Sequence, residues 1–587
     1  MMRLGIDIGA RHVDLALADR ASCRTLKLPV DGRDAASAIL EAIDTALARW
    51  QSSLEMLEEI RIGSTGAVNL LLSRTGPRIG LLTTRGFADT LGLGRQNRAY
   101  LYDPVATAGT PDFLVAPENI RTVGGRIGPD GKETQPLDTD DLEQAAQNFA
   151  ALGLEAVAIC LLFAHVDATH EERCAAFLRD RLPGIHVALS SAVDGRAREY
   201  ERTVATCLEA WLRPSELSTL DAVEAGLARR GFAGRLRFAD GRGWLLAPPE
   251  ARRAVSSLLL SGPAAAAGAA AGLAARLELA QAVAVDCGST TTEISLLRDG
   301  TLGRKSEGSY ASVLLRQPHG DVESIPLGGA TEFPDGQGGS LAFETAMTEF
   351  SSAVGGAPQN AAAEEGLLKL SRAVLRHCVS RNVDPTDAAL IAMGGMGGIV
   401  ACGIADRLGM SEIIVPAGHG TAGAWGLHLA REITEARLRI AEDCVDLTPE
   451  RLSQAAAELL GRLNGASGTL SFSADVAASA HMHGFEVELG SDIPTPDDIV
   501  KAISDHHRLT YGIPSPGTGH LFTLNVRSLP EPEKIAWPEI PDAWIEAARA
   551  QPSRLDGADG DVIVGEGWRI ATATATHLVL RRRPDHE

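Results

Sequence analysis

An eight-residue pattern occurs twice in this chain, each time between two short apolar runs. The first copy, DIGARHVD, spans residues 7–14, and the second, DCGSTTTE, spans residues 286–293. Each copy has the composition of a β-hairpin with a glycine in its turn and an acid at either end. Two such hairpins in one chain predict two similar lobes that face each other across a cleft.

The chemistry of each hairpin suits a nucleoside triphosphate. A glycine turn directs several backbone N–H groups toward one point, where phosphate oxygens can accept from them. The leading carboxylates, Asp7 and Asp286, can hold Mg²⁺ or position a water molecule for catalysis. The alternative for each copy is a plain tight turn. The predicted nucleotide-binding residues of the two hairpins are Gly9, Arg11, Gly288, Ser289, Thr290 and Thr291.

A third glycine-rich segment, GGMGG at residues 394–398, follows an apolar run and precedes a helical pattern. Glycine lets the backbone approach a flat adenine or ribose, and the N-terminus of the following helix can face a phosphate. We therefore expect Gly394, Gly395 and Gly397 to line the adenosine side of the site. The alternative is a simple strand-to-helix turn.

Charge and cysteine usage exclude several classes of partner. The chain of 587 residues carries a net charge of −21, which argues against nucleic acid or an anionic membrane as its main partner. Its eight cysteines form no CxxC pair, so the expected compartment is a reducing cytoplasm.

Residues 254–275 carry no charge and are about long enough to span a bilayer, but Gly262-Pro263 interrupts them and alanine dominates them. We expect a buried helix that begins near Pro263.

Strand and helix patterns alternate along the chain, which is typical of an α/β fold. We predict an N-terminal lobe at residues 1–205 and a second lobe at residues 206–432, each with one hairpin. The composition changes after about residue 430. A separate α+β domain is therefore expected at residues 433–587, ending with a strand near 577–581. A helix is also predicted at residues 434–441.

Several longer motifs make the chain resemble the A component of the hydantoinase/oxoprolinase family. These motifs are TTRGF at 83–87, GRQNR at 94–98, REYERT at 198–203 and LSGPA at 260–264, and the resemblance covers nearly the whole chain. It implies an α/β fold with a two-lobed actin-like ATPase (ribonuclease H-like) core and an added C-terminal α+β domain.

The resemblance also implies an activity. In the cyclic-amide branch of this family, ATP with Mg²⁺ phosphorylates the carbonyl oxygen of a lactam or imide, and hydrolysis commonly needs a B-type hydantoinase/oxoprolinase subunit. We therefore expect a subunit of an ATP-dependent cyclic amide hydrolase. The alternative is a subunit of an ATP-dependent ketone carboxylase of the acetone or acetophenone type, and no residue separates the two.

The first hairpin departs from the family pattern, which usually reads GGTFTD. Here Arg11 and Val13 replace two hydroxyl residues, Ile62 replaces a usual histidine, and a later glycine segment is reduced to residues 328–330. The Arg11 guanidinium could pair with a phosphate as a fork, or its bulk could block the site. These departures leave a third hypothesis open, in which the chain is a non-catalytic scaffold subunit.

Overall fold

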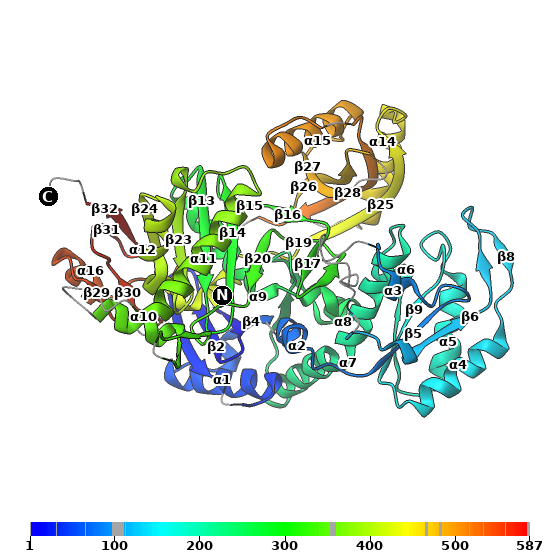
Figure 1. Ribbon diagram of the computed structural model, residues 1–587, viewed down its shortest axis with the longest axis horizontal. Coiled ribbons are helices and arrows are strands. Elements are labelled where there is room, and N and C mark those ends of the chain that lie inside the picture. Colours follow the sequence, from blue (N-terminus) through cyan, green and yellow to red (C-terminus); the bar gives the residue numbers. More distant parts are fainter. Residues whose placement is uncertain are drawn as a thin grey trace.

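The computed structural model of the protein describes residues 2–30, 32–64, 66–96, 111, 113–336, 338–352, 360–463, 468–479, 484–515, 517–531, 533–557 and 559–583. Two lobes occupy the left side of Figure 1, where the N-terminal lobe is blue and the second lobe is green. A smaller α/β unit lies on the right in cyan, and a third unit lies at the top in yellow and orange.

The N-terminal lobe is built on a six-stranded sheet with the order β12-β11-β4-β1-β2-β3. Neighbouring strands β1, β2 and β3 are antiparallel, whereas β4 and β11 join in parallel. Helix α1 (Ala35–Arg49) begins after Asp34, whose carboxylate accepts from the backbone N–H of Ser37 at 3.0 Å. The strands are β1 (Met2–Ile8), β2 (His12–Ala18), β3 (Cys23–Pro29), β4 (Leu57–Ser64), β11 (Arg235–Ala239) and β12 (Leu245–Leu246).

The second lobe repeats this arrangement. Its sheet has the order β15-β14-β13-β23-β24-β32-β31, and β20 also pairs with β14. Helices α11 (Ala361–Val379) and α12 (Gly397–Leu408) pack against it in one hydrophobic core. The strands are β13 (Gln281–Cys287), β14 (Thr292–Arg298), β15 (Thr301–Leu302), β20 (Val322–Ile325), β23 (Ala389–Met393), β24 (Glu412–Pro416), β31 (Trp568–Ala573) and β32 (His577–Arg582).

Five strands of each lobe follow the same path. In the N-terminal lobe the order is β3-β2-β1-β4-β11, and in the second lobe it is β15-β14-β13-β23-β24. Both paths begin with an antiparallel meander and continue with two parallel strands. The prediction of a two-lobed actin-like core with a hairpin in each lobe is therefore confirmed.

The alanine-rich helix α9 (Ser261–Arg276) lies between the two sheets. Its alanines share a core with Ala16 of β2 and with Ala284 of β13. Small side chains allow this close approach, and Trp425 of the short helix α13 (Ala422–Gly426) fills the space beside them. The predicted buried helix is thus present. None of the helices that the structure describes combines the length and apolar composition needed to cross a membrane.

Two further units surround the lobes. The first has a parallel sheet of order β10-β9-β5-β6, and the second has an antiparallel sheet of order β25-β28-β26-β27. Elements of the first are β5 (Ile79–Thr84), β6 (Ile120–Val123), β9 (Ala156–Cys160), β10 (His186–Leu189), α4 (Thr139–Ala151) and α5 (Thr169–Arg181). Elements of the second are β25 (Thr434–Asp443), β26 (Thr469–Ala477), β27 (Phe485–Gly490), β28 (His520–Leu529), α14 (Pro449–Arg462) and α15 (Pro496–Tyr511).

Shorter elements connect these units. Helix α7 (Glu199–Arg229) is much longer: its 31 residues join the cyan unit to the N-terminal lobe. Short elements include α2 (Gly66–Ser73), η3 (Val255–Leu258), β18 (Val313–Leu315), β19 (His319–Gly320), α10 (Phe343–Ser352) and η5 (His419–Thr421).

The structure corrects one predicted element. Residues 434–441, predicted as a helix, belong to strand β25. Ala436, Leu438 and Ile440 point to one core while charged residues alternate with them, and this period of two fits a strand.

Sheet pairing also divides the chain differently from the predicted domains. The expected boundary at 205/206 falls inside α7, and β11 returns to the sheet of the N-terminal lobe. The strand predicted near 577–581 is β32, and together with β31 it extends the sheet of the second lobe through β24. The α+β unit is therefore an insertion into the second lobe.

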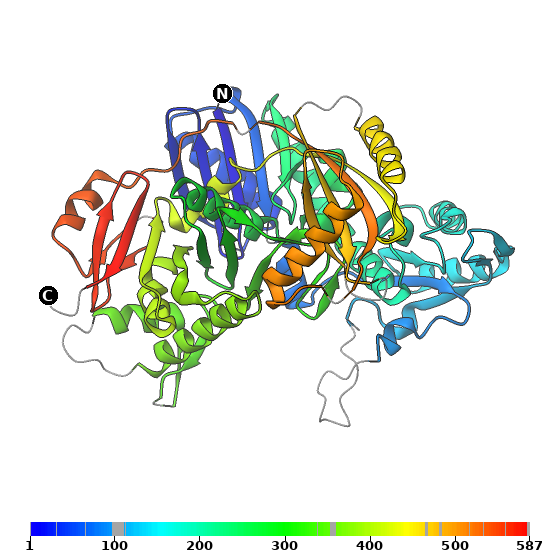
Figure 2. The same cartoon turned by 90° about the horizontal axis from the view of Figure 1, so that it is seen from above.

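The return connection crosses the N-terminal lobe. In Figure 2 it runs as a thin orange segment over the blue sheet toward the red hairpin. The backbone N–H of Ala536 donates to the carbonyl of Asp19 at 2.9 Å, and the rings of Trp537 and Trp425 lie 5.0 Å apart.

Candidate active site

The two predicted hairpins have the same turn geometry. The N–H of Gly9 donates to the carbonyl of His12 at 2.8 Å, and the N–H of Gly288 donates to the carbonyl of Thr291 at 3.0 Å. In both hairpins the leading acid is directly opposite a second acid. Asp7 pairs with Asp14 in the register of the strands, and Asp286 pairs with Glu293. Directly opposite residues share a face of the sheet, so each hairpin presents two carboxylates.

These two pairs act on each other electrostatically and form one carboxylate cluster (Asp7, Asp14, Asp286 and Glu293). Burial raises the pKa of Asp7 to about 7, and the charges of Asp14 and Asp286 add to the rise. Burial and the charge of Glu293 raise the pKa of Asp286 to about 8. Burial likewise raises the pKa of Glu293 to about 7 and that of Asp14 to about 6. The charge of Asp286 in the second lobe thus acts on Asp7 in the N-terminal lobe.

Lys27 of β3 reaches into this cluster. Its Nζ lies 2.6 Å from Oδ1 of Asp14, and its charge lowers the pKa of Asp7, Asp14 and Asp286 against the effect of burial. The pKa values stay high in spite of this ammonium group, so its charge offsets the four carboxylates only in part.

No three of the described His, Cys, Asp and Glu side chains are grouped closely enough to hold a metal ion by themselves, so a divalent cation here would rely on Asp7 and Asp286 together with oxygens of a ligand or of water. Oδ1 of Asp7 is buried and has no hydrogen-bond partner within the described ranges. A buried polar atom without a partner is costly and needs an explanation such as an ion. Carboxylate oxygens are the ligands that Mg²⁺ prefers. Asp7 and Asp286 are therefore the side chains that would hold it.

Glycine residues, which have no side chain, lie against both leading acids. A Cβ atom at Gly423 would lie 2.0 Å from Oδ2 of Asp7, and one at Gly63 would lie 3.4 Å from its Oδ1. A Cβ at Gly394 would lie 2.5 Å from Oδ1 of Asp286. The two carboxylates are therefore seated against close backbone, which fixes their positions.

The glycine segment predicted for adenosine lies beside the second hairpin. Gly394 has a φ of +82°, and its N–H donates to the carbonyl of His419 at 2.8 Å. The N–H of Met396 donates to the carbonyl of Cys287 at 3.0 Å. Gly397 begins α12, and a Cβ at Gly395 would meet no atom within 4 Å. The segment is thus attached to the hairpin while Gly395 borders open space.

The turns themselves remain partly accessible. Arg11 lies exposed at the tip of the first turn, and Gly9, Gly288, Ser289 and Thr290 are half-buried. Thr291 differs, because its hydroxyl forms a hydrogen bond with Glu293 and helps to lower the pKa of that carboxyl. Apart from Thr291, these predicted residues are free to meet a ligand at their accessible atoms.

A shortened glycine segment still supports the second turn. The N–H of Gly329 donates to the carbonyl of Gly288 at 2.9 Å, and the N–H of Ala330 donates to that of Ser289 at 2.7 Å. A Cβ at Gly328 would lie 2.6 Å from the backbone N of Thr290. Residues 328–330 therefore keep this turn in shape.

Three further residues near the cluster belong to none of the motifs that predicted the site from the sequence. Lys27 could have been found only from the register of β2 and β3, in which it is opposite Asp14. His419 is 2% exposed, its Nε2 has no partner among the described residues, and burial lowers its pKa to about 4. Asp559 accepts from the Thr25 hydroxyl at 2.9 Å, and burial raises its pKa.

Other sequence motifs have structural roles or lie outside the described residues. Arg95 forms an ion pair of 2.6 Å with Glu201, which joins the motif at 94–98 to the one at 198–203. Thr65, Asn97 and Arg98 lie outside the described residues.

Comparison with protein families gives a consistent match along the chain. The model of the hydantoinase/oxoprolinase N-terminal region matches residues 3–182, and the hydantoinase/oxoprolinase model matches residues 202–357 and 344–436. These ranges contain both hairpins and the glycine segment at 394–398.

Individual relatives agree with the family models. The caprolactamase subunit alpha of Pseudomonas jessenii is 27% identical over 525 residues, which are 78% of this chain and 75% of the relative. The acetophenone carboxylase gamma subunit of Aromatoleum aromaticum is 27% identical over 317 residues, which are 51% of this chain and 43% of the relative.

Solved structures show the same fold over the full length. A nucleotide-free acetone carboxylase structure superposes with a TM-score of 0.78 and 19% identity, covering 99% of both chains. The ATP-dependent caprolactamase of Pseudomonas jessenii superposes with a TM-score of 0.77 and 23% identity, covering 99% of this chain and 100% of the other.

Proposed function

The chain belongs to the hydantoinase/oxoprolinase family, and from this premise we propose that it is the ATP-binding subunit of an ATP-dependent cyclic amide hydrolase. The observation that carries the proposal is the carboxylate cluster. The acids of the two hairpins act on one another's charge across the lobes, and Asp7 keeps a buried oxygen atom that has no partner among the described residues. The Mg²⁺ ion of a magnesium–nucleotide complex would supply the positive charge that these carboxylates need.

The residues divide the work as follows. Asp7 and Asp286 would hold Mg²⁺ and position water, while the phosphates would be surrounded by Gly9, Arg11, Gly288, Ser289, Thr290 and Thr291. Gly394, Gly395 and Gly397 line the adenosine. ATP would supply the phosphoryl group for a substrate carbonyl oxygen, which weakens the neighbouring C–N bond. The protein contributes position and charge neutralisation, as in other phosphoryl transfers.

The departures from the family pattern leave this site largely intact. Val13 and Ile62 are 1% and 3% exposed and belong to the core of the N-terminal lobe. Their apolar side chains therefore fill the core instead of facing the carboxylate cluster. Arg11 is exposed at the turn, where its guanidinium can reach a phosphate. This burial favours an active site over a scaffold.

Calorimetry tests the nucleotide site directly. Titration of the full chain with ATP and Mg²⁺ is expected to give heat of binding, and the Asp286→Ala variant is expected to lose it. A scaffold subunit would give no heat, and its assembled complex would keep its activity after Asp286→Ala. Either of these results would overturn the proposal.

A partner subunit and the substrate need a second experiment. The relatives named above are subunits of larger enzymes, and we propose a B-type hydantoinase/oxoprolinase subunit as the partner here. ATP consumption by the reconstituted complex is expected with lactams or imides. Consumption that requires a ketone and bicarbonate instead would establish the carboxylase alternative.

A further inference from the structure

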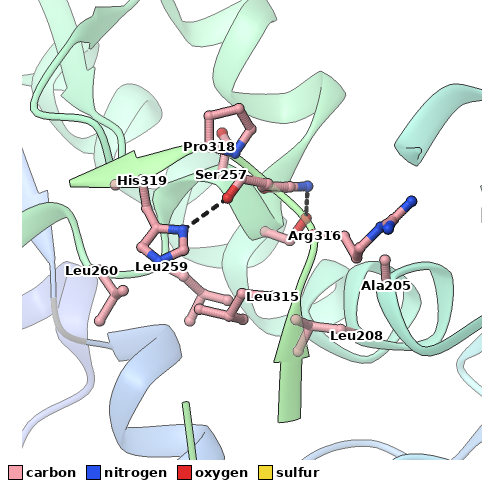
Figure 3. A pocket seen from close by; sticks show the side chains of 12 residues that line it. Ala205, Leu208, Ser257, Leu259, Leu260, Leu315, Arg316, Pro318 and His319 are labelled. Atoms are coloured by element: carbon pink, nitrogen blue, oxygen red, sulfur yellow. Dashed lines mark hydrogen bonds between the residues drawn. The ribbon is translucent and has the colours of Figure 1, made fainter. Parts of the chain in front are cut away.

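The hollow between α7, η3 and β18–β19 is too small for an organic ligand. Its apolar wall, which includes Leu208, Leu259 and Leu315, closes around room for about one water molecule (Figure 3). Large apolar side chains without cover lie on the surface instead. Thirteen of them are exposed in the described part of the chain, and six of these belong to α11 or to the end of α15. These six form the apolar strip: Leu368, Leu375, Val379, Leu509, Tyr511 and Ile513.

Helix α11 carries the first part of the apolar strip on the face that points away from its core. Leu368, Arg372, Leu375 and Val379 are exposed and follow one another at intervals of four, three and four residues, so they share one face of the helix. The opposite face packs in the core of the second lobe. A helix that is apolar on its solvent face as well as on its core face offers a surface for another protein element.

The end of α15 carries the second part of the apolar strip. Leu509 lies in the last turn of this helix, and Tyr511 and Ile513, which are 62% and 60% exposed, flank Gly512. Gly512 has a φ of +74° and ends the helix, as glycine commonly does at a helix C-terminus. Asp505 is also exposed and lies four residues before Leu509, on the same face of the helix.

The two helices meet at their C-terminal ends. A Cβ atom at Gly512 would lie 3.9 Å from Oδ1 of Asn382, which is three residues beyond the end of α11. In Figure 2 the orange α15 and the light-green α11 converge there. From this junction Arg372 lies ten residues back along the chain and Asp505 lies seven residues back, which are about 15 and 11 Å at the rise of a helix. The two charges therefore lie at similar distances from the junction, one on each helix.

These two charges indicate what covers the apolar strip. Lys369, beside Arg372 on α11, is already paired with Glu365 at 2.8 Å. Arg372 and Asp505 form no ion pair with another described residue. The apolar strip thus presents one unpaired cation and one unpaired anion at matched distances from its centre, which makes it complementary to itself. A surface that forms a two-fold interface has this property.

We propose that the apolar strip binds a second copy of this chain, with a two-fold axis through the junction of Gly512 and Asn382. The axis places α11 of each copy on the end of α15 of the other. Arg372 then pairs with Asp505 of the partner subunit, and the same contact occurs a second time across the axis. The apolar side chains between these pairs are removed from water. The inference goes beyond the proposed function and does not depend on it.

Sedimentation velocity of the full chain alone, at micromolar concentrations, tests the proposal. The expected result is an equilibrium between monomer and dimer. Arg372→Glu and Asp505→Arg each bring like charges together twice, and each should raise the dissociation constant at least about tenfold. The variant with both changes has opposite charges in exchanged positions and should dimerise as the wild type does. Arg179→Glu, at an exposed arginine of α5, makes the same charge change elsewhere and should leave dimerisation unchanged.

The Val379→Ser variant tests the apolar contacts separately from the charges. It should weaken the dimer, since the new hydroxyl loses water when the two copies meet. Val166→Ser, at a valine of the cyan unit that is 41% exposed, is the matched control and should have no effect. Both valines are exposed, so the urea midpoints of the two variants should equal that of the wild type.

Several results would overturn the proposal. A wild-type chain that stays monomeric excludes the dimer, and if a B-type subunit then shields Tyr511 from solvent, the apolar strip belongs to that partner instead. A dimer that persists unchanged in Arg372→Glu and Val379→Ser must use another face. If both single reversals weaken the dimer and the double variant does not restore it, Arg372 and Asp505 are not paired across the axis.

Discussion

Oδ1 of Asp286 lies 2.5 Å from the point that a Cβ atom would occupy at Gly394. The glycine segment and the second hairpin are therefore fitted to each other with no room for a methyl group. Gly394 also has a φ of +82°, a backbone conformation that residues other than glycine rarely adopt. Both observations make this glycine a part of the site's construction.

The Gly394→Ala variant should consequently lose stability and nucleotide binding together. Its Cβ would also meet the Cys287 carbonyl at 2.3 Å, and backbone atoms cannot move aside cheaply. We expect a loss of more than about 2 kcal/mol in the free energy of unfolding, measured by urea denaturation. Gly395→Ala is the matched control. It should fold normally, since a Cβ there meets nothing within 4 Å, and any loss of ATP affinity reports on the ligand alone.

The Gly423→Ala variant tests whether the position of the Asp7 carboxylate matters for binding. The new methyl group would lie 2.0 Å from Oδ2 of Asp7 and would push the carboxylate from its position. Overpacking of this kind costs about 1–3 kcal/mol, and we expect Mg²⁺-dependent ATP binding to weaken with it. Gly268→Ala in α9 meets no atom within 4 Å and should be neutral or stabilising. Normal ATP binding by Gly423→Ala would contradict the assigned role of Asp7.

The carboxylate cluster predicts a pH dependence of stability. The folded pKa values of Asp7, Asp14 and Asp286, at about 7, 6 and 8, lie above the ordinary carboxyl value. The folded state therefore holds protons that the unfolded state releases near pH 4, and stability falls as pH rises from about 4 to 8. We expect the urea midpoint to decline over this range and the decline to be smaller in Asp286→Asn.

Magnesium provides the complementary measurement. Because the cation binds ionised carboxylates, added Mg²⁺ should raise the urea midpoint more at pH 8 than at pH 5. Identical pH profiles for the wild type and Asp286→Asn would show that the cluster does not hold these protons.

The Arg11→Ala variant distinguishes the two interpretations of Arg11, which either pairs with a phosphate or blocks the site by its bulk. If the guanidinium pairs with a phosphate, its loss should weaken ATP binding by roughly 0.2–1 kcal/mol, since the side chain is exposed. Calorimetry at low salt measures the effect, and Arg20→Ala, at the exposed turn after β2, controls for the change in net charge. Tighter ATP binding in Arg11→Ala would show that Arg11 obstructs the site.

Local patterns in the sequence predicted the parts of the fold that depend on neighbouring residues. The two hairpins follow from glycine and acid spacing between apolar runs, and α9 follows from its alanines and Pro263. Strand β25 was missed because Glu435, Arg437 and Arg439 are good helix formers. The buried face of Ala436, Leu438 and Ile440 overrides that propensity.

Contacts between distant residues were beyond such patterns. Asp559 accepts from Thr25 across 534 positions of sequence, and no spacing rule relates them. Lys27 required knowledge of the strand register before it could be placed opposite Asp14. The leading acids were predictable because the hairpin that positions each of them is continuous in sequence.

The hairpin β31–β32 joins the sheet of the second lobe although it follows β24 only after the whole inserted α+β unit. During synthesis, β24 is complete long before residues 577–581 leave the ribosome to pair with it. Until residues 577–581 pair with β24, the buried side chains of Ile413, Ile414 and Val415 therefore border an unpaired strand edge, the kind of edge on which chains associate. A chain truncated before residue 577 would leave this edge of β24 unpaired and would be prone to aggregation.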